Sequence, residues 1–150
     1  MDPLSALSVA GTIVQFVDYG TKLLSNAREL YRSSVGTLDA NNELELVTTD
    51  LRALIAKLRM SFYSRAFDPG SVEAQQRASF DRLCDDAAKL AEELLERLDK
   101  LKNRKEKHKA WHSLQKAVAS AWSATEVAEL KRRLLGFREA LETRVLFSLR

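Results

Sequence analysis

The sequence predicts an all-α protein, an antiparallel bundle of four to five helices with a hydrophobic N-terminal helix. Apolar residues recur at spacings of three and four along most of the 150-residue chain. Only five Gly and two Pro are present, and no alternating strand pattern or hairpin dipeptide appears. Apolar stripes of this kind suit knobs-into-holes packing between helices. Because a chain of this length can bury a core of its own, residues 1–150 are predicted to form a single domain.

The N-terminal segment is the most unusual part of the chain. Residues 3–17 carry no charge, although 30% of the protein is charged. A secretory signal would need a basic start, and here the only charged side chain before the run is the acidic Asp2. A membrane span would need about 20 apolar residues, and Asp18 interrupts the run too early. Asp2 as N-cap and Pro3 at the first helical position instead predict a helix over residues 3–33.

The apolar side chains of this first helix cover an unusually wide arc. At 100° per residue they span roughly 240°, whereas a helix lying on a bundle needs a stripe only somewhat wider than about 100°. Two interpretations are open: a central core helix that is buried on most sides, or a helix that binds a membrane or a partner conditionally. For the second interpretation the candidate membrane-active residues are Leu4, Leu7, Val9, Ile13, Val14, Phe16 and Val17.

Two further helices are predicted in the first two thirds of the chain. Asn42 and Glu45 form a capping-box-like start for a helix over residues 43–65. The turn "DPGS" ends at Ser71, which is expected to cap a long helix over residues 71–103. The apolar stripe of the earlier helix runs through Leu44, Val47, Leu51, Leu54, Leu58 and Phe62. The stripe of the later helix runs through Phe80, Leu83, Ala87, Leu90, Leu94, Leu98 and Leu101.

Two shorter patterns complete the bundle. A helix over residues 106–121 places Trp111 and Trp122 on one stripe with Leu114 and Val118. "SATE", from Ser123 to Glu126, is a capping box that opens a last helix over residues 124–149. The apolar stripe of that helix comprises Val127, Leu130, Leu134, Phe137, Leu141, Val145 and Leu149.

Charge is distributed unevenly. Residues 1–99 hold 11 basic and 16 acidic residues, a net of −5, whereas residues 100–150 hold 13 and 5, a net of +8. The segment "KLKNRKEKHK" is the densest in positive charge. Its basic residues are Lys100, Lys102, Arg104, Lys105, Lys107 and Lys109. They either solvate a helix junction or form a patch for an anionic surface, where each gains roughly 1 kcal/mol near an anionic bilayer.

Nucleic acid would use the same charges and is the weaker interpretation of this patch. No nucleic-acid motif accompanies the segment, and the stripe shared by Trp111 and Trp122 points to core residues and not to base-stacking platforms. Nucleic acid is therefore not among the expected partners.

The search for catalytic or metal-binding motifs predicts no enzyme and no cofactor. The chain has no Gly-rich phosphate loop and no nucleophile elbow. His108 and His112 have a metal-compatible spacing, but Lys109 stands where a zinc protease has Glu, and the surrounding charge repels a cation. The single cysteine, Cys84, precedes two acids that oppose thiolate formation, and it is expected to be structural. The acid pairs Asp85–Asp86 and Glu92–Glu93 are interpreted as a solvated helix face.

Two stretches resemble a known family. "MDPLSALSVAGTIVQFVDYGTKLLSNARELYRSS", followed by "NNELELVTTDLRAL", resembles the start of many fungal NOD-like receptors. The tail "WHSLQKAVASAWSATEVAELKRRLLGFREALETRVLFSLR" resembles the end of the same N-terminal module, just before the nucleotide-binding domain. Together the stretches cover well over half of the chain, in the expected order. The module resembles a HeLo-like domain.

The resemblance implies a helical bundle that executes programmed cell death at the plasma membrane after induced self-association. It assigns the membrane-active role to residues 3–17. The implied partners are an anionic phospholipid membrane, further copies of the domain, and the nucleotide-binding and repeat domains of a full-length receptor. The implied location is cytoplasmic at rest and the plasma membrane once activated. These 150 residues contain no nucleotide-binding domain or repeat array, so an isolated effector module is expected. The alternative is a non-lytic signalling adaptor that docks the same apolar arc on another protein's helices.

Overall fold

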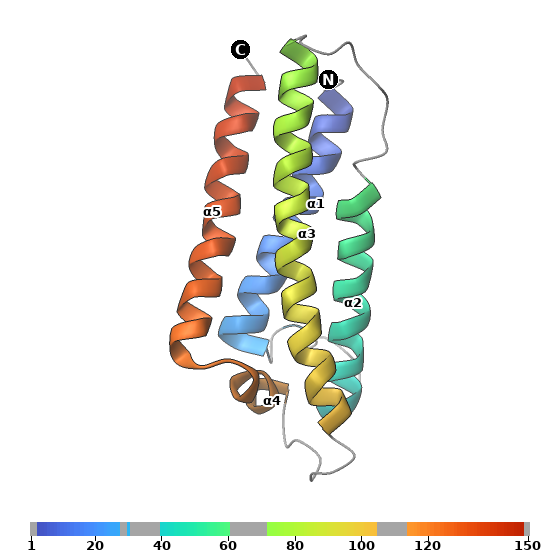
Figure 1. Ribbon diagram of the computed structural model, residues 1–150, viewed down its shortest axis with the longest axis vertical. Helices are drawn as coiled ribbons and strands as arrows, with labels where there is room; N and C mark the ends of the chain where they lie inside the picture. Colours follow the sequence, from blue (N-terminus) through green and yellow to red (C-terminus); the bar gives the residue numbers. More distant parts are fainter. Residues whose placement is uncertain (1–2, 28–29, 31–39, 61–71, 105–113, 149–150) are drawn as a thin grey trace.

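The computed structural model describes residues 3–27, 30, 40–60, 72–104 and 114–148, and this part of the chain is an all-α bundle (Figure 1). The predicted fold class is confirmed. The helices are α1 (Pro3–Asn26), α2 (Ala40–Met60), α3 (Val72–Arg104), α4 (Leu114–Ala121) and α5 (Ala124–Ser148).

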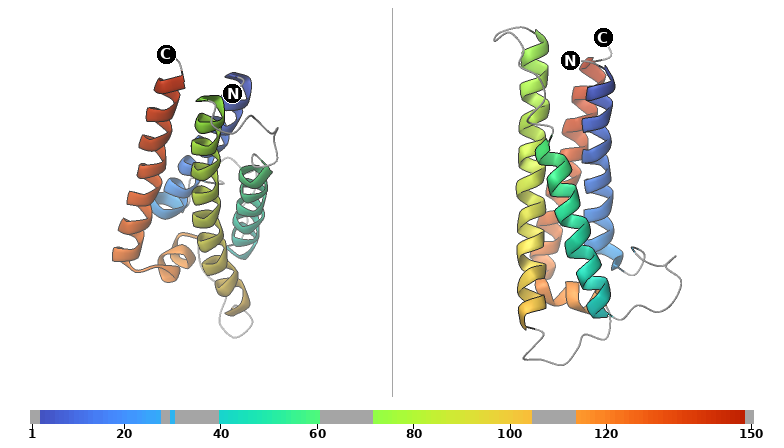
Figure 2. Two further views of the ribbon diagram at one scale, coloured as in Figure 1. Left: turned by 45° about the horizontal axis from the view of Figure 1, so that its top comes forward. Right: turned by 90° about the vertical axis from the view of Figure 1, so that its right-hand side faces the viewer.

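The four long helices run alternately up and down, and the short α4 lies across one end of the bundle (Figure 1). α1 and α3 run in one direction, and α2 and α5 run in the other, so α1 begins at the end where α5 finishes. Figure 2 shows α1 beside α5 and α2 beside α3, and these two neighbour relations provide most of the packing between helices. The bundle is therefore assembled from two antiparallel pairs.

The core follows the apolar stripes that the sequence predicts. Every member of the α3 stripe, from Phe80 to Leu101, is buried. In α2 the stripe is buried from Leu44 to Leu58, while Phe62 lies outside the described residues. In α5 the stripe is less deeply placed: Leu130, Leu134 and Leu141 are buried, and Val127 and Phe137 are half-buried. The last two members, Val145 and Leu149, are not described at the side-chain level.

Two helix ends differ from the predicted ones. The α-helical part of α1 ends at Asn26, and Ala27 and Leu30 have 3-10 geometry, whereas the sequence predicted a helix to residue 33; residues 28–29 and 31–33 lie outside the described residues. α2 begins at Ala40, three residues earlier than expected. A capping residue needs a non-helical backbone, so Asn42, inside the first turn, is not the N-cap of α2. Other predicted features lie outside the described residues: the Asp2 cap, residues 61–65 at the predicted end of the second helix, the 68–71 turn with Ser71, and residues 106–113 with Trp111.

The capping box at the start of α5 has the predicted geometry. The Ser123 hydroxyl accepts the N–H of Glu126 at 3.1 Å, and the Glu126 carboxylate accepts the N–H of Ser123 at 3.1 Å. The backbone hydrogen bond from Ser123, with further help from its side chain and from Arg97, lowers the pKa of Glu126. These bonds fix the corner at which the chain turns from α4 into α5.

Candidate functional site

Most of the described apolar arc of α1 is part of the core. Ile13 and Phe16 are fully buried, Val17 is 3% exposed, and Val9 is half-buried. Val14 is the exception, with 45% of its surface exposed. The side chains of Leu4 and Leu7 lie outside the described residues. The core-helix interpretation therefore describes Ile13, Phe16 and Val17, and the arc reaches the surface at Val14.

The several neighbours of α1 explain why so much of its circumference is apolar. α1 contacts all of the other helices, α5 above all. Its polar side faces solvent: Ser8, Gly11 and Gln15 are exposed. A helix with neighbours on several sides needs an apolar arc far wider than a helix on the surface of a bundle.

A shallow groove runs between α1 and α5 next to Val14. Its volume is about 190 Å³, and it is lined by Val14, Val17, Asp18, Arg138, Leu141 and Glu142. Val17 and Leu141 are buried at its base, and Arg138 pairs with Glu142 at 3.4 Å on the rim. The groove is smaller than the roughly 300–1,000 Å³ of a typical small-molecule pocket. It is better suited to receive one or two side chains of a partner.

The basic patch is described only at its first two lysines, and they differ. Lys100 is 61% exposed and pairs with Glu96 at 3.5 Å within α3. Lys102 is 24% exposed, and its ammonium lies 2.6 Å from the Glu45 carboxylate of α2 and 3.5 Å from the Thr48 hydroxyl. Lys102 therefore joins two helices, while Lys100 is a surface residue. The Arg104 side chain, Lys105, Lys107 and Lys109 lie outside the described residues.

The acidic face of α3 forms ion pairs with basic residues of α2, which the sequence interpretation missed. Arg59 of α2 donates to Asp85 at 2.6 Å and to Glu92 at 2.8 Å. Two turns earlier in α2, Arg52 pairs with Asp99 at 3.1 Å. The hydrogen bonds that Lys89 and then Arg59 donate to Asp85 lower the pKa of Asp85, and the hydrogen bonds that Arg59 donates to Glu92 and then to Asp85 raise the pKa of Arg59.

The sequence contained a signal for these ion pairs between α2 and α3. Arg52 and Arg59 are seven residues apart, and the acids Asp85, Glu92 and Asp99 are also spaced by seven. Residues seven apart share one face of a helix, so two such rows on neighbouring antiparallel helices meet along a seam.

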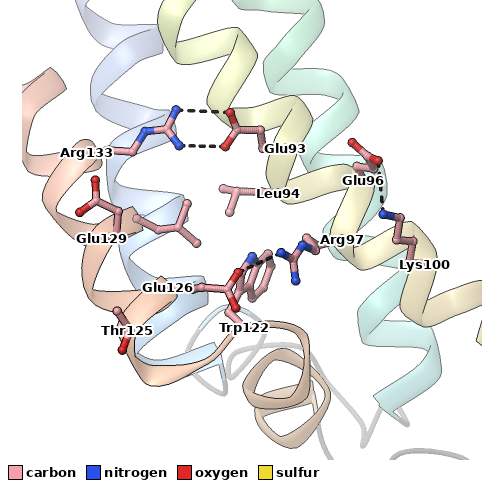
Figure 3. Close-up of a pocket in the computed structure, with 11 residues that line it drawn as sticks. Glu93, Leu94, Glu96, Arg97, Lys100, Trp122, Thr125, Glu126, Glu129 and Arg133 are labelled. Atoms are coloured by element: carbon pink, nitrogen blue, oxygen red, sulfur yellow. Dashed lines mark hydrogen bonds and ion pairs between the residues drawn. The ribbon is translucent and has the colours of Figure 1, made fainter.

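A second groove opens between α3 and α5 near α4 (Figure 3). Its volume is about 480 Å³, and Leu94, Trp122 and Leu130 form its apolar base. Two ion pairs cross it: Arg133 to Glu93 at 2.8 Å, and Arg97 to Glu126 at 2.9 Å. The other charged lining residues are also paired, Lys100 with Glu96 and Glu129 with Arg132. Charges that neutralise one another in this way hold helices in place and leave no single group poised for catalysis.

The described residues contain no group of His, Cys, Asp and Glu that would hold a metal ion. His108 and His112 lie outside them. Cys84 is 1% exposed within the core, in keeping with a structural role. Trp122 is also a core residue: it is 6% exposed, and Leu114 and Val118 of the same stripe are buried as well. Within the described helices, no stretch is both long enough and apolar enough to cross a membrane.

Comparisons of the chain with protein-family models, curated proteins and solved structures find no match. The feature that stands out in the described part of the molecule is α1, whose residues 3–17 carry no charge and which contacts all of the other helices.

Proposed function

We propose that the protein is a regulated effector domain of the kind found at the N-terminus of fungal NOD-like receptors, with α1 as its membrane-active element. At rest α1 is held in the bundle, and after self-association it acts on an anionic membrane to cause cell death. The observation that carries the proposal is the uncharged segment 3–17, whose apolar arc is wider than a surface helix needs and reaches solvent at Val14. The resemblance of the sequence to HeLo-like domains supports it.

The burial of α1 makes such a domain inactive until it is triggered. Exposing Ile13, Phe16 and Val17 costs about 1.5–3 kcal/mol for each side chain. A domain of this size is stable by only about 5–15 kcal/mol in total, so α1 rarely leaves the bundle unaided. Lipid or neighbouring copies have to receive the apolar surface, which is why activation would depend on self-association.

Lys100 supports attraction to an anionic membrane. It is exposed, and its ion pair with Glu96 is of the surface kind that contributes about 0–1 kcal/mol. The gain of about 1 kcal/mol per basic residue near an anionic bilayer is of similar size, so membrane contact can compete with this pair. Lys102 is committed to Glu45 and adds less.

The test is leakage of vesicles that contain phosphatidylserine, with the domain fused to an inducible dimerisation module. Val14→Glu places a charge at the exposed part of the arc and leaves the core intact. Gln15→Glu is the matched control, because it adds the same charge at the next residue, which is also exposed. We expect Val14→Glu to abolish leakage and Gln15→Glu to retain it, with equal helix content by circular dichroism. Equal leakage from the two variants would refute the membrane role of the arc.

The signalling adaptor is the second candidate, and the groove beside Val14 favours it. A partner helix that inserts a side chain between α1 and α5 would contact Val14 and Leu141 without opening the bundle. An adaptor leaves vesicles intact after induced dimerisation. Intact vesicles, together with signalling that Val14→Glu abolishes in a fungal host, would favour the adaptor over the lytic effector.

A further inference from the structure

We infer that the solvent-facing side of α2 is a self-association surface, at which two copies of the chain pair α2 against α2 in antiparallel orientation about a two-fold axis. This goes beyond the proposed function, which requires self-association but assigns no surface to it. The dimer is measured without a membrane, so its failure and the failure of the lytic role are distinguishable.

An uncharged stripe runs along the exposed side of α2. This outer stripe consists of Leu46, Thr49, Ala53, Ala56 and Met60, all of which are exposed. The spacings of three, four, three and four keep these residues on one face of the helix for about four turns, as in the seam of a coiled coil. Leu46 is 37% exposed and Met60 is 72% exposed, so a large apolar side chain stands in solvent at each end. α2 lies on one side of the bundle and α5 on the other (Figure 1).

The exposed side of the neighbouring helix α3 is quite different. Between residues 82 and 100, every exposed residue of α3 is charged. Those residues are Arg82, Asp86, Lys89, Glu92, Glu93, Glu96, Arg97 and Lys100. A helix face that only has to be solvated carries charge in this way, whereas an exposed apolar face is typical of an interaction site. The outer stripe of α2 is therefore better suited to a partner than to water.

The sizes of the side chains in the outer stripe suit two antiparallel copies. In the register that covers the whole stripe, Leu46 faces Ala56 of the second copy. Thr49 likewise faces Ala53 of the second copy, and Met60 lies over the first turn of the second α2. Each central layer thus sets a larger side chain against an alanine, and the two-fold axis repeats every contact. The surface is in this sense complementary to itself.

Burial of the one polar member of the outer stripe costs little. The Thr49 hydroxyl donates to the Glu45 carbonyl oxygen within α2 at 2.9 Å. Its hydrogen is therefore satisfied before any partner arrives. The methyl group of Thr49 is the part that the second copy contacts.

The charges that flank the outer stripe disfavour a parallel pair. In a parallel coiled coil, a residue on one flank lies beside the residue five positions later in the second copy. Arg52 would then lie beside Lys57 of the second copy. Glu45 would lie beside Asp50 of the second copy. Both contacts join like charges, so a parallel pair is repelled along its length.

In the antiparallel pair the flanking charges attract at both ends. On one flank Glu43 lies beside Lys57 of the second copy, and the two-fold axis repeats this contact. On the other flank Glu45 lies beside Arg59 of the second copy. Glu45 and Arg59 already pair with residues of α3, so the contact between Glu43 and the exposed Lys57 is the one that selects the orientation.

Like charges meet only at the centre of the antiparallel pair. Arg52 lies beside Arg52 of the second copy, and each is already neutralised by Asp99 of its own α3 at 3.1 Å. Asp50 lies beside Asp50 of the second copy, and each accepts the Tyr19 hydroxyl of its own chain at 3.2 Å. One repulsive contact between carboxylates is thus set against two attractive contacts at the ends.

Sedimentation equilibrium of the full chain tests the dimer. Ala53→Glu places a carboxylate in the centre of the outer stripe of both copies. Ala128→Glu is the matched control, because it makes the same change at an exposed alanine within α5. We expect the wild type and Ala128→Glu to dimerise, and Ala53→Glu to associate at least about tenfold more weakly with equal helix content by circular dichroism. A wild type that stays monomeric, or equal association of the two variants, would overturn the inference.

Charge reversal tests the orientation. Glu43→Lys and Lys57→Glu each set like charges against one another in the antiparallel pair and should weaken association. Both changes in one chain restore the attraction with the signs exchanged, so the double variant should associate more tightly than either single variant. A parallel pair predicts that Lys57→Glu alone tightens association, because it relieves the repulsion with Arg52. That result, or the absence of rescue in the double variant, would refute antiparallel pairing.

Disulfide trapping tests the register. Thr49→Cys and Ala53→Cys chains, each with Cys84→Ala, are oxidised separately and as a mixture. The antiparallel register sets residue 49 of one copy against residue 53 of the other, so the mixture should link faster than either chain alone. Faster linking within the separate solutions would overturn the assigned register. A dimer that passes these tests and yet leaves phosphatidylserine vesicles intact would refute the lytic role and retain the α2 surface.

Discussion

Gly20 of α1 lies against the Leu134 side chain of α5, where an added Cβ would be 3.1 and 3.2 Å from the two methyl carbons of the leucine. Contacts this short are tighter than most Cβ contacts, and Leu134 is fully buried with little room to move. The absence of a side chain at residue 20 therefore sets how closely the two helices approach.

The first prediction compares two glycines of α1. Gly20→Leu should destabilise the domain by about 1–3 kcal/mol, because the larger side chain over-packs the contact with Leu134. Gly11→Leu should stabilise it by about 0.5–1 kcal/mol, because a Cβ there meets nothing within 4 Å and leucine favours the helix. Urea denaturation at neutral pH measures both changes. Equal effects of the two substitutions would contradict the close approach at Gly20.

The fold was predicted well because it depends on the spacing of apolar residues along the chain. The stripes of α2 and α3 and the capping box at Ser123 are patterns among residues close together in sequence, and these patterns determine which helices form and where α5 begins. The end of α1 and the start of α2 were less predictable. Asn42 and Glu45 have the spacing of a capping box. In the structure α2 already includes Asn42, Leu44 is fully buried, and the Glu45 carboxylate pairs with Lys102 of α3.

The candidate site was less predictable than the fold, because burial and pairing depend on neighbours that are distant in sequence. The apolar arc did not reveal that Ile13 and Phe16 are enclosed and that Val14 is exposed. Charge density likewise did not distinguish Lys100 from Lys102, whose partner lies on another helix.

The second prediction separates the core part of the α1 arc from its surface part. Phe16→Ala should cost about 3–5 kcal/mol, since it removes a fully buried ring. Val14→Ala should cost about 0.5 kcal/mol or less, because Val14 is 45% exposed. Thermal denaturation followed by circular dichroism provides the comparison. A large loss from Val14→Ala would mean that the groove beside α5 is closed in solution.

The third prediction concerns the α5 capping box. Ser123→Ala should cost about 0.5–2 kcal/mol, because the Glu126 N–H loses its acceptor. Ser120→Ala is the control. The Ser120 hydroxyl donates to the Ala117 carbonyl oxygen within α4 and caps no helix start, so the change should be close to neutral. Urea midpoints of the two variants test the difference, and equal midpoints would contradict the role of the cap.

The fourth prediction is a pH dependence at the same corner. The pKa of Glu126 is lower in the folded protein than in the unfolded chain, so its stabilising effect is complete above the unfolded pKa. The effect is lost as the pH falls through the folded pKa. Glu126→Gln keeps a hydrogen-bond acceptor for Ser123 but cannot titrate. The wild-type protein should therefore lose stability more steeply than Glu126→Gln as the pH is lowered from 6 towards 3, a range chosen around the usual Glu pKa of about 4.3. Parallel curves would contradict the shift.

The last prediction divides the basic patch into a structural lysine and a surface lysine. Lys102→Gln should destabilise the domain by about 1 kcal/mol, because its ammonium joins Glu45 of α2 to α3 and is only 24% exposed. Lys100→Gln should leave stability unchanged, since its pair with Glu96 lies within one helix and is largely exposed. Sedimentation with phosphatidylserine vesicles should show the reverse order: Lys100→Gln weakens binding, Lys102→Gln weakens it less, and rising salt reduces the difference. If both variants bind vesicles as the wild type does at every salt concentration, neither lysine contributes to membrane attraction, and Lys100 serves only to keep the end of α3 solvated.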